Sequence, residues 1–339
     1  MFTIELSEDD RRRIDVLVAE ILDGHDRPDD PGLLDRLAVH AQEMPRAVRT
    51  AANHFRLHEP AGGCLFTGFR VDDDAIGDTP AHWGGARHRT AREDLFLLLC
   101  ASLLGDPIAW ATQQDGRLLH DVMPIKGHER EQINSSTEAP LWWHTEDAFH
   151  PYRAHYVGLL CLRNPDAVET TYAAFDDLEL DEETTRTLME PRYVIRPDES
   201  HLPRNRGGLG GAAPRELLRR SFAWVEEMNV NPPPTPVLFG DPKAPYGRLD
   251  PYFMDRRDDD PEAMAAFDRF VKEIDDKLTS VVLRPGDALF IDNYKSVHGR
   301  KPYAARHDGR DRWLRRVNVT RDLRSSRSAR AAAGARVIH

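Results

Sequence analysis

The sequence has little of what a secreted or membrane-embedded protein needs. Its three cysteines, Cys64, Cys100 and Cys161, show no CxxC spacing, so neither a disulfide framework nor a zinc knuckle is indicated. Its most apolar run, 95–104, is about half of the roughly 20 residues that span a bilayer. The first residues lack a cationic region followed by an apolar stretch, so no signal peptide is predicted. We therefore expect a cytoplasmic protein that has no membrane partner.

Positive charge is also in short supply, because the formal net charge is −11. Nucleic-acid binding needs a basic face that displaces counterions from phosphates, so we expect no nucleic-acid partner. The acidity mildly favours a cationic partner or substrate, although acidity also simply keeps proteins in solution. The one basic stretch is the tail 321–339, whose composition predicts a solvated extension, with nucleic-acid binding as the less favoured alternative.

With 339 residues and 40 % hydrophobic content, the chain is large enough for a real core. Helical periodicity predicts N-terminal helices within about 7–58 and further helices near 90–105, 181–189 and 261–278. About ten short strand-like segments lie within about 64–320, and several are joined by turns too short for a helical crossover. The fold class predicted is mainly β with flanking helices, a β-sandwich or jelly roll in a single domain over 1–339.

The glycine-rich stretch 201–213 has no periodicity of either kind. Its position in mid-chain suggests a lid loop over an active site, spanning about 198–225, and a plain surface loop is the alternative.

A histidine and a carboxylate stand two residues apart in the β-prone segment 141–149. Residues i and i+2 of a strand project to the same face, so His144 and Glu146 could bind one metal ion together. Far along the chain, a tight turn leads into the apolar strand 288–291 and then to His298. Two imidazoles and one carboxylate form a facial triad, which leaves positions open for substrate and O₂ on non-haem Fe(II).

Two arginines follow the last of these histidines in a strand-like segment. Alternation places Arg312 and Arg316 on one face with Leu314. A guanidinium captures a carboxylate through two hydrogen bonds, so one arginine could hold an organic-acid cosubstrate and the other an amino-acid carboxylate. The alternative is that both are exposed strand residues with ordinary ion pairs.

The segments WHTEDAFHPYRAHYVGLLCLRNPD (143–166), DNYKSVHGR (292–300) and RWLRR (312–316) resemble the clavaminate-synthase-like branch of Fe(II)/2-oxoglutarate oxygenases. Within it, the chain is similar to the L-arginine hydroxylases of viomycin-type and streptothricin-type antibiotic biosynthesis, from about residue 90 to residue 320. The glutamate of the HxE triplet matches this branch, and halogenases of the superfamily lack the carboxylate ligand. The resemblance therefore implies hydroxylation rather than halogenation.

The resemblance implies a distorted double-stranded β-helix, or jelly roll, with Fe(II) held by His144, Glu146 and His298. It also implies that 2-oxoglutarate, as cosubstrate with O₂, pairs its far carboxylate with Arg312 and contacts Thr171. In this family 2-oxoglutarate is decarboxylated to succinate and CO₂ while a carbon of the substrate is hydroxylated. Thr171 could equally be an ordinary β-branched strand residue.

By the same resemblance, free L-arginine is the expected small-molecule substrate. Its carboxylate would meet Arg316, its α-amino group Gln113 and Glu146, and its guanidinium Asp198 and Asp250. Gln113 could instead be a plain strand-end residue, and Asp198 a turn aspartate after proline. Near Asp250 the family often has a second acid two residues on, where this chain has Tyr252. Because that departure could shift the target carbon relative to iron, hydroxylation at C3, or at both C3 and C4, is expected.

Three alternatives remain at this point. Asparagine or another free amino acid could take the place of arginine in the same cradle. A zinc hydrolase would also use two histidines and one carboxylate, but it leaves Arg312 without a role. A non-catalytic binding module could share the fold, since a fold does not determine a function.

Overall fold

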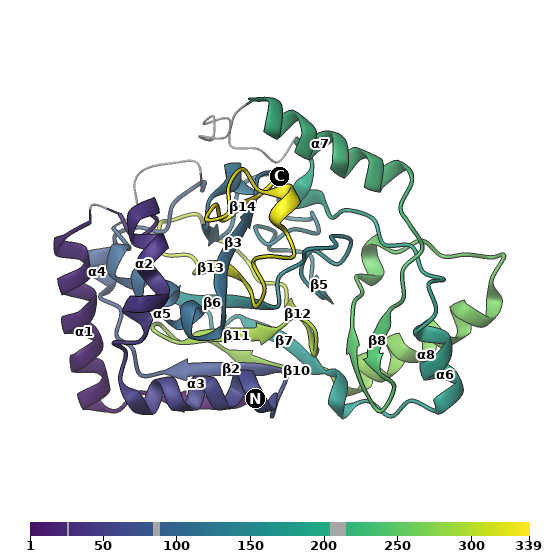
Figure 1. Cartoon of the computed structure of the whole chain (residues 1–339), viewed down its shortest axis with the longest axis horizontal. Helices are drawn as coiled ribbons and strands as arrows, with labels where there is room; N and C mark the ends of the chain where they lie inside the picture. Colours follow the sequence, from purple (N-terminus) through teal and green to yellow (C-terminus); the bar gives the residue numbers. More distant parts are fainter. Residues whose placement is uncertain (26, 84–88, 204–214) are drawn as a thin grey trace.

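The structure is a computed structural model that describes residues 1–25, 27–83, 89–203 and 215–339. Two sheets lie face to face in its centre, with helices covering their outer sides (Figure 1). The larger sheet has eight strands in the order β1, β2, β11, β6, β13, β3, β14, with β4 also paired to β13. These strands are β1 (Phe2–Glu5), β2 (Gly63–Thr67), β3 (Asp106–Trp110), β4 (Leu119–Val122), β6 (Tyr156–Arg163), β11 (Ala288–Asp292), β13 (Trp313–Thr320) and β14 (Val337–Ile338).

The smaller sheet has four strands in the order β10, β7, β12, β5, and a separate hairpin is formed by β8 and β9. Their bounds are β5 (Leu141–His144), β7 (Glu169–Ala174), β8 (Leu238–Asp241), β9 (Ala244–Gly247), β10 (Thr279–Val282) and β12 (Ser296–Arg300). As expected from the short connections, most neighbouring strands are antiparallel; only β1 with β2 and β14 with β3 are parallel among the described pairs.

Helices cover the outer face of each sheet. Helix α5 lies against β6 and β13 and is surrounded by α1, α2 and α3, whereas α6 and α8 pack at the far side, on the smaller sheet (Figure 1). The helices are α1 (Glu8–Asp23), α2 (Pro31–Ala41), α3 (Arg46–His58), α4 (Asp73–Ile76), α5 (Ala91–Leu104), α6 (Glu182–Leu188), α7 (Arg215–Val230) and α8 (Pro261–Lys277). None of the described helices is long and apolar enough to cross a membrane.

Local sequence signals explain where several of these elements begin. Helix α1 starts at a capping box in which the backbone N–H of Asp10 donates to Ser7 Oγ at 3.1 Å. Helix α8 starts with Asp260 as N-cap and Pro261 at the first position. Before β11 the chain turns at Gly286, whose φ is +94° and where a Cβ would lie 1.9 Å from the carbonyl oxygen of Phe69. Only glycine fits that turn.

Strand β13 has two different faces, as alternation predicted. Trp313, Val317 and Val319 turn toward the helices, whereas Leu314 packs between the two sheets. On the helix side Arg315 forms ion pairs with Asp94 at 2.6 Å and Asp121 at 2.5 Å. Because Arg315 and Arg316 are adjacent in the strand, they serve opposite faces of the sheet.

The prediction of a solvated tail is wrong. Strand β14 pairs with β3, Ile338 is buried, and the Arg330 guanidinium donates to the carbonyl oxygens of Leu323, Ala333 and Ala335 at 2.6 to 2.7 Å. Arg330 therefore holds the tail in a defined conformation by donating to its backbone carbonyls. Composition alone does not reveal such hydrogen bonds.

The predicted lid region 198–225 also needs correction. Residues 215–225 belong to α7, and Glu199–His201 form the short 3₁₀ helix η3. The rest of the glycine-rich stretch, 204–214, lies outside the described residues. In the N-terminal region, the helices expected within 7–58 are α1, α2 and α3; β1 precedes the first of them, and Pro45 separates α2 from α3.

Candidate active site

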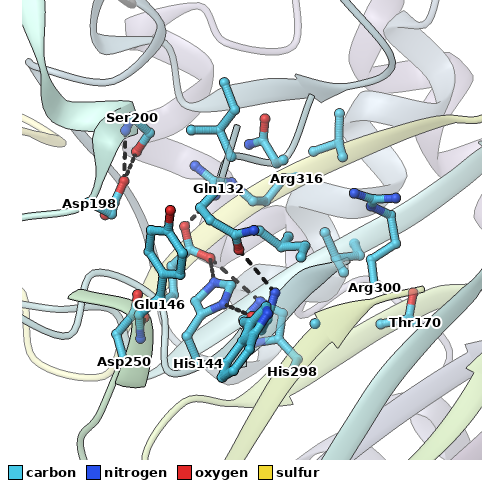
Figure 2. Close-up of a pocket in the computed structure, with 18 of the residues that line it drawn as sticks. Gln132, His144, Glu146, Thr170, Asp198, Ser200, Asp250, His298, Arg300 and Arg316 are labelled. Atoms are coloured by element: carbon cyan, nitrogen blue, oxygen red, sulfur yellow. Dashed lines mark hydrogen bonds and ion pairs between the residues drawn. The ribbon is translucent and has the colours of Figure 1, made fainter. Parts of the chain in front are cut away.

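The predicted metal ligands converge between the two sheets. His144 ends β5 and is the direct cross-strand partner of His298 in β12. Glu146 lies in the turn after β5, beyond the strand in which it was expected, yet its carboxylate still meets both imidazoles. Its Oε2 lies 3.8 Å from His144 Nε2 and 3.5 Å from His298 Nε2 (Figure 2). Three ligand atoms within 4.8 Å of one another could hold a single metal ion.

Further hydrogen bonds orient this triad. His144 Nδ1 donates to the carbonyl oxygen of Trp142 at 2.7 Å, which leaves Nε2 free to face a metal. The buried Asn293 side chain makes two hydrogen bonds to the backbone of Glu146. Its Oδ1 accepts from the Glu146 N–H at 2.6 Å, and its Nδ2 donates to the Glu146 carbonyl oxygen at 3.0 Å. The turn that carries Glu146 is therefore anchored to the segment between β11 and β12.

Charges around the triad favour an ionised Glu146. Burial alone would raise the pKa of this carboxyl, but the Arg316 guanidinium and the two histidines hold it well below its usual value. Burial likewise opposes the charged form of His144, yet the nearby carboxylates of Glu146 and Asp250 raise its pKa to about 9. Glu146 is therefore in the carboxylate form that binds a metal ion.

Arg316 links the triad to the rest of the cavity. Its guanidinium donates to Glu146 Oε1, to Gln113 Oε1 at 3.0 Å and to His120 Nδ1 at 2.7 Å. His120 is the cross-strand neighbour of Arg316 in β4, and burial lowers its pKa well below the usual value, which suits a neutral imidazole that accepts a hydrogen bond. Both acceptors expected for a substrate ammonium, Gln113 and Glu146, are thus engaged by Arg316 itself.

One end of the cavity is cationic. Arg312 is 4 % exposed and, within the part of the chain that the structure describes, forms no ion pair with a carboxylate. Its Nη2 lies 3.4 Å from Thr170 Oγ1, and burial lowers its pKa. Arg300, at the end of β12, lines the same part of the cavity (Figure 2). Two buried guanidiniums without carboxylate partners among the described residues provide a place for a carboxylate ligand.

The expectation for Thr171 is wrong by one residue. Thr170 lines the cavity beside Arg312, whereas Thr171 projects to the opposite face of β7 and lies against Gly299. Side chains alternate along a strand, so a shift of one position moves a residue to the other face.

The other end of the cavity is anionic. Asp198 and Asp250 both line it, on the side away from Arg300 (Figure 2). Each caps a 3₁₀ helix: Asp198 accepts from the backbone N–H of Ser200 at 2.9 Å, and Asp250 from that of Tyr252 at 3.2 Å at the start of η5 (Pro251–Phe253). Burial raises the pKa of Asp250 to about 6, with His144 opposing and Asp198 adding to the rise. No described lysine or arginine forms an ion pair with either carboxylate.

The structure also contains a second cluster of polar side chains, which the sequence did not predict. His201 Nε2 lies 2.8 Å from Asp147 Oδ1, and Gln113 Nε2 donates to the same oxygen at 2.9 Å and to Ser200 Oγ at 2.7 Å. The cluster connects the segment that follows Asp198 to the turn that carries Glu146. Asp147 has a positive φ of 50°, an uncommon backbone conformation outside glycine, but nothing in the sequence alone marks it.

Residues 47–318 match the family described as taurine catabolism dioxygenase TauD, TfdA family. The chain belongs to this family. It is therefore a dioxygenase, and the interpretations as a zinc hydrolase or a non-catalytic module are excluded. This TauD/TfdA member is 46 % identical to an enduracididine β-hydroxylase of Streptomyces hygroscopicus and 42 % identical to an L-ornithine/L-arginine 3-hydroxylase of Catenulispora acidiphila. Each alignment covers 100 % of both chains.

A solved structure is also similar to the chain over its whole length. It is that of the non-haem iron oxygenase OrfP in complex with Fe, succinate and (3S)-hydroxy-L-Arg, with 41 % identity, a TM-score of 0.94 and 100 % of both chains covered. The resemblance inferred from the three motifs is thereby confirmed.

Proposed function

We propose that this dioxygenase hydroxylates free L-arginine at C3 and uses Fe(II), O₂ and 2-oxoglutarate. The observation that carries the proposal is the charge arrangement of the cavity. Arg312 and Arg300 line one end, Asp198 and Asp250 line the other, and the triad lies between them. A dicarboxylate suits the first end and a cationic side chain suits the second, because buried charges need partners of opposite sign.

In this proposal His144, Glu146 and His298 hold the iron. When bound, iron with O₂ and 2-oxoglutarate supplies the oxidation that yields succinate, CO₂ and a hydroxylated carbon. Arg312, with Thr170 beside it, holds the far carboxylate of 2-oxoglutarate. The burial of Arg312, Arg300 and Asp250 keeps their charged groups in fixed positions around the reactants.

Arg316 holds the carboxylate of arginine. Because Arg316 engages Gln113 and Glu146 in the structure, a substrate carboxylate would share its guanidinium and leave Gln113 Oε1 to accept from the substrate ammonium. Asp250 and Asp198 then receive the guanidinium. The names of two relatives, a 3-hydroxylase and a β-hydroxylase, designate the same carbon and support C3 as the position of attack.

The same relationship supports the finer description of the fold. We propose that the eight-stranded and four-stranded sheets are the two halves of a distorted jelly roll, with the iron between them.

Two other amino acids are alternative candidates for this site. Enduracididine is favoured by the relative at 46 % identity. Asparagine, considered above, has a neutral side chain and would leave the buried Asp250 without a partner, so the structure favours a cationic substrate.

The test is incubation of the enzyme with Fe(II), ascorbate, 2-oxoglutarate and one amino acid at a time: arginine, enduracididine or asparagine. We expect mass spectrometry to show that arginine gains one oxygen and that succinate forms in equal amount. NMR should place the new hydroxyl at C3. A gain of two oxygens would show a second hydroxylation. Succinate formation that arginine does not stimulate would contradict the proposal. If only asparagine stimulated it, asparagine would be the substrate instead.

A further inference from the structure

Two aromatic side chains of the cavity stay exposed where the rest of the protein buries its aromatic surface. Among the large apolar side chains that are exposed in the described residues, the aromatic ones are Trp142, at 49 % exposed, and Tyr252, at 55 %. Both line the active-site cavity. Exposed apolar surface concentrated at a cavity of charged groups indicates a ligand that covers it.

The two residues lie at different places in the cavity. The carbonyl oxygen of Trp142 accepts from a metal-ligand candidate, His144, so this residue belongs to the iron region. Tyr252 belongs to the anionic end, because its backbone N–H donates to Asp250 Oδ1 at 3.2 Å. The 3₁₀ helix η5 thus presents a carboxylate and, two residues later, an aromatic side chain to the same cavity.

This pairing suits a guanidinium better than an ammonium. A guanidinium is planar and weakly hydrated, so its edge can bind a carboxylate while its face stacks on an aromatic ring. An ammonium is compact and strongly hydrated and has no face to stack. The pairing of Asp250 with Tyr252 therefore distinguishes two cations of equal charge, which the carboxylate alone would not do.

We infer that the Tyr252 ring stacks on the guanidinium of the substrate and makes the site selective for guanidines over amines. The inference rests on the proposed function, and it gives a role to the side chain two residues after Asp250. A second acid would add charge and bind either cation. A ring in its place adds a preference for shape.

The packing of Tyr252 leaves this role open to it. Its ring contacts that of Phe253 edge to face, with the centroids 5.0 Å apart. The residue nevertheless stays 55 % exposed. A ring with this much exposed surface at the cavity can stack on a ligand.

The experiment measures the dissociation constants of L-arginine and L-lysine by calorimetry, on enzyme loaded with Fe(II) and 2-oxoglutarate under nitrogen. Wild type is compared with Tyr252→Phe, which keeps the ring and removes the hydroxyl, and with Tyr252→Leu, which keeps apolar bulk and removes the ring. Leu57→Ala, an exposed apolar side chain on α3 outside the cavity, controls for surface changes. Circular dichroism checks that each variant folds.

We expect Tyr252→Leu to weaken arginine binding about fivefold and to change lysine binding by less than about twofold. Tyr252→Phe and Leu57→Ala should bind arginine as wild type does. Wild-type affinity for arginine in Tyr252→Leu would overturn the inference, and so would a loss in Tyr252→Phe equal to that in Tyr252→Leu, because the hydroxyl would then be responsible. Absence of arginine binding to wild type would instead contradict the proposed function.

Discussion

The two ends of the active-site cavity differ in the elements that carry their charges. At the cationic end, Arg300 closes β12 and Arg312 directly precedes β13, so the ladders of both sheets determine their positions. At the anionic end, Asp198 and Asp250 are N-caps of short 3₁₀ helices in the connections between sheet strands. One end belongs to the core and the other to the loops.

This difference separates what is constant in the reaction from what is variable. A sheet position is held by hydrogen bonds on both sides and resists displacement, whereas a capped turn moves with any change in loop length or sequence. In the proposed function, recognition of 2-oxoglutarate would depend on the rigid end, and recognition of the amino-acid side chain on the adaptable end.

The largest loss of activity is expected from a change at the metal site, which lies between the two ends of the cavity and which both ligands need for the reaction. Replacing His298 by alanine removes a ligand that β12 places directly opposite His144. We expect loss of bound iron and a fall in both succinate and hydroxyarginine formation on the order of 1000-fold or more. Metal analysis of the purified protein and product assays check this. A variant that retained iron and turnover would remove His298 from the triad.

A change at the cationic end should affect the cosubstrate alone. Arg312→Gln removes the guanidinium that has no carboxylate partner among the described residues. We expect the KM for 2-oxoglutarate to rise about 30- to 100-fold, because a buried charge pair is lost, while arginine affinity changes by less than about twofold. Arg312→Lys should lie between, since it keeps the charge and loses the two-pronged geometry. Equal losses for both ligands would mean that the two ends are not separate.

The complementary change at the anionic end should affect the amino acid alone. Asp250→Asn keeps an oxygen that can accept from the Tyr252 backbone, so η5 should stay capped. The affinity for arginine should fall about 10- to 30-fold, because a hydrogen-bonded charge pair is lost. The KM for 2-oxoglutarate should not change. Calorimetry with arginine and steady-state kinetics with 2-oxoglutarate test the two statements, and unchanged arginine affinity would refute the role of Asp250.

The difference between the two ends also determined what the sequence could reveal. The faces of β13 follow from alternation in strands, a local pattern that can be counted, whereas Glu146 reaches the two histidines from the turn after β5. Arg312, Leu314 and Arg316 accordingly line the cavity as predicted. The same rule failed at Thr171, because an error of one residue in register exchanges the faces of a strand. Thr170 is the residue at the cavity.

Contacts between distant segments could not be predicted in this way. Asp147, His201 and His120 acquire partners that lie 34 to 196 residues away in the chain, such as Gln113 and Arg316. Each would pass for an ordinary polar residue in its own segment. The packed tail was missed for a related reason, since Arg330 bonds to backbone carbonyls, which have no sequence signature.

The smallest expected effect is that of pH, which should change arginine turnover at the anionic end and leave 2-oxoglutarate binding at the cationic end unchanged. Burial raises the pKa of Asp250 to about 6, and only the ionised carboxylate attracts a guanidinium. Above this pKa the anionic end is charged, and below it the charge is lost, so kcat/KM for arginine should decrease as the pH falls through about 6, by up to tenfold per pH unit. The bound iron adds positive charge near Asp250 and moves this inflection in kcat/KM to somewhat lower pH, and the bound substrate moves the inflection in kcat further in the same direction. The Arg312 and Arg300 guanidiniums remain charged over this range, so the KM for 2-oxoglutarate should stay level. The profile of Asp250→Asn should lack the decrease that wild type shows, and an identical decrease in both would assign the titration to another group.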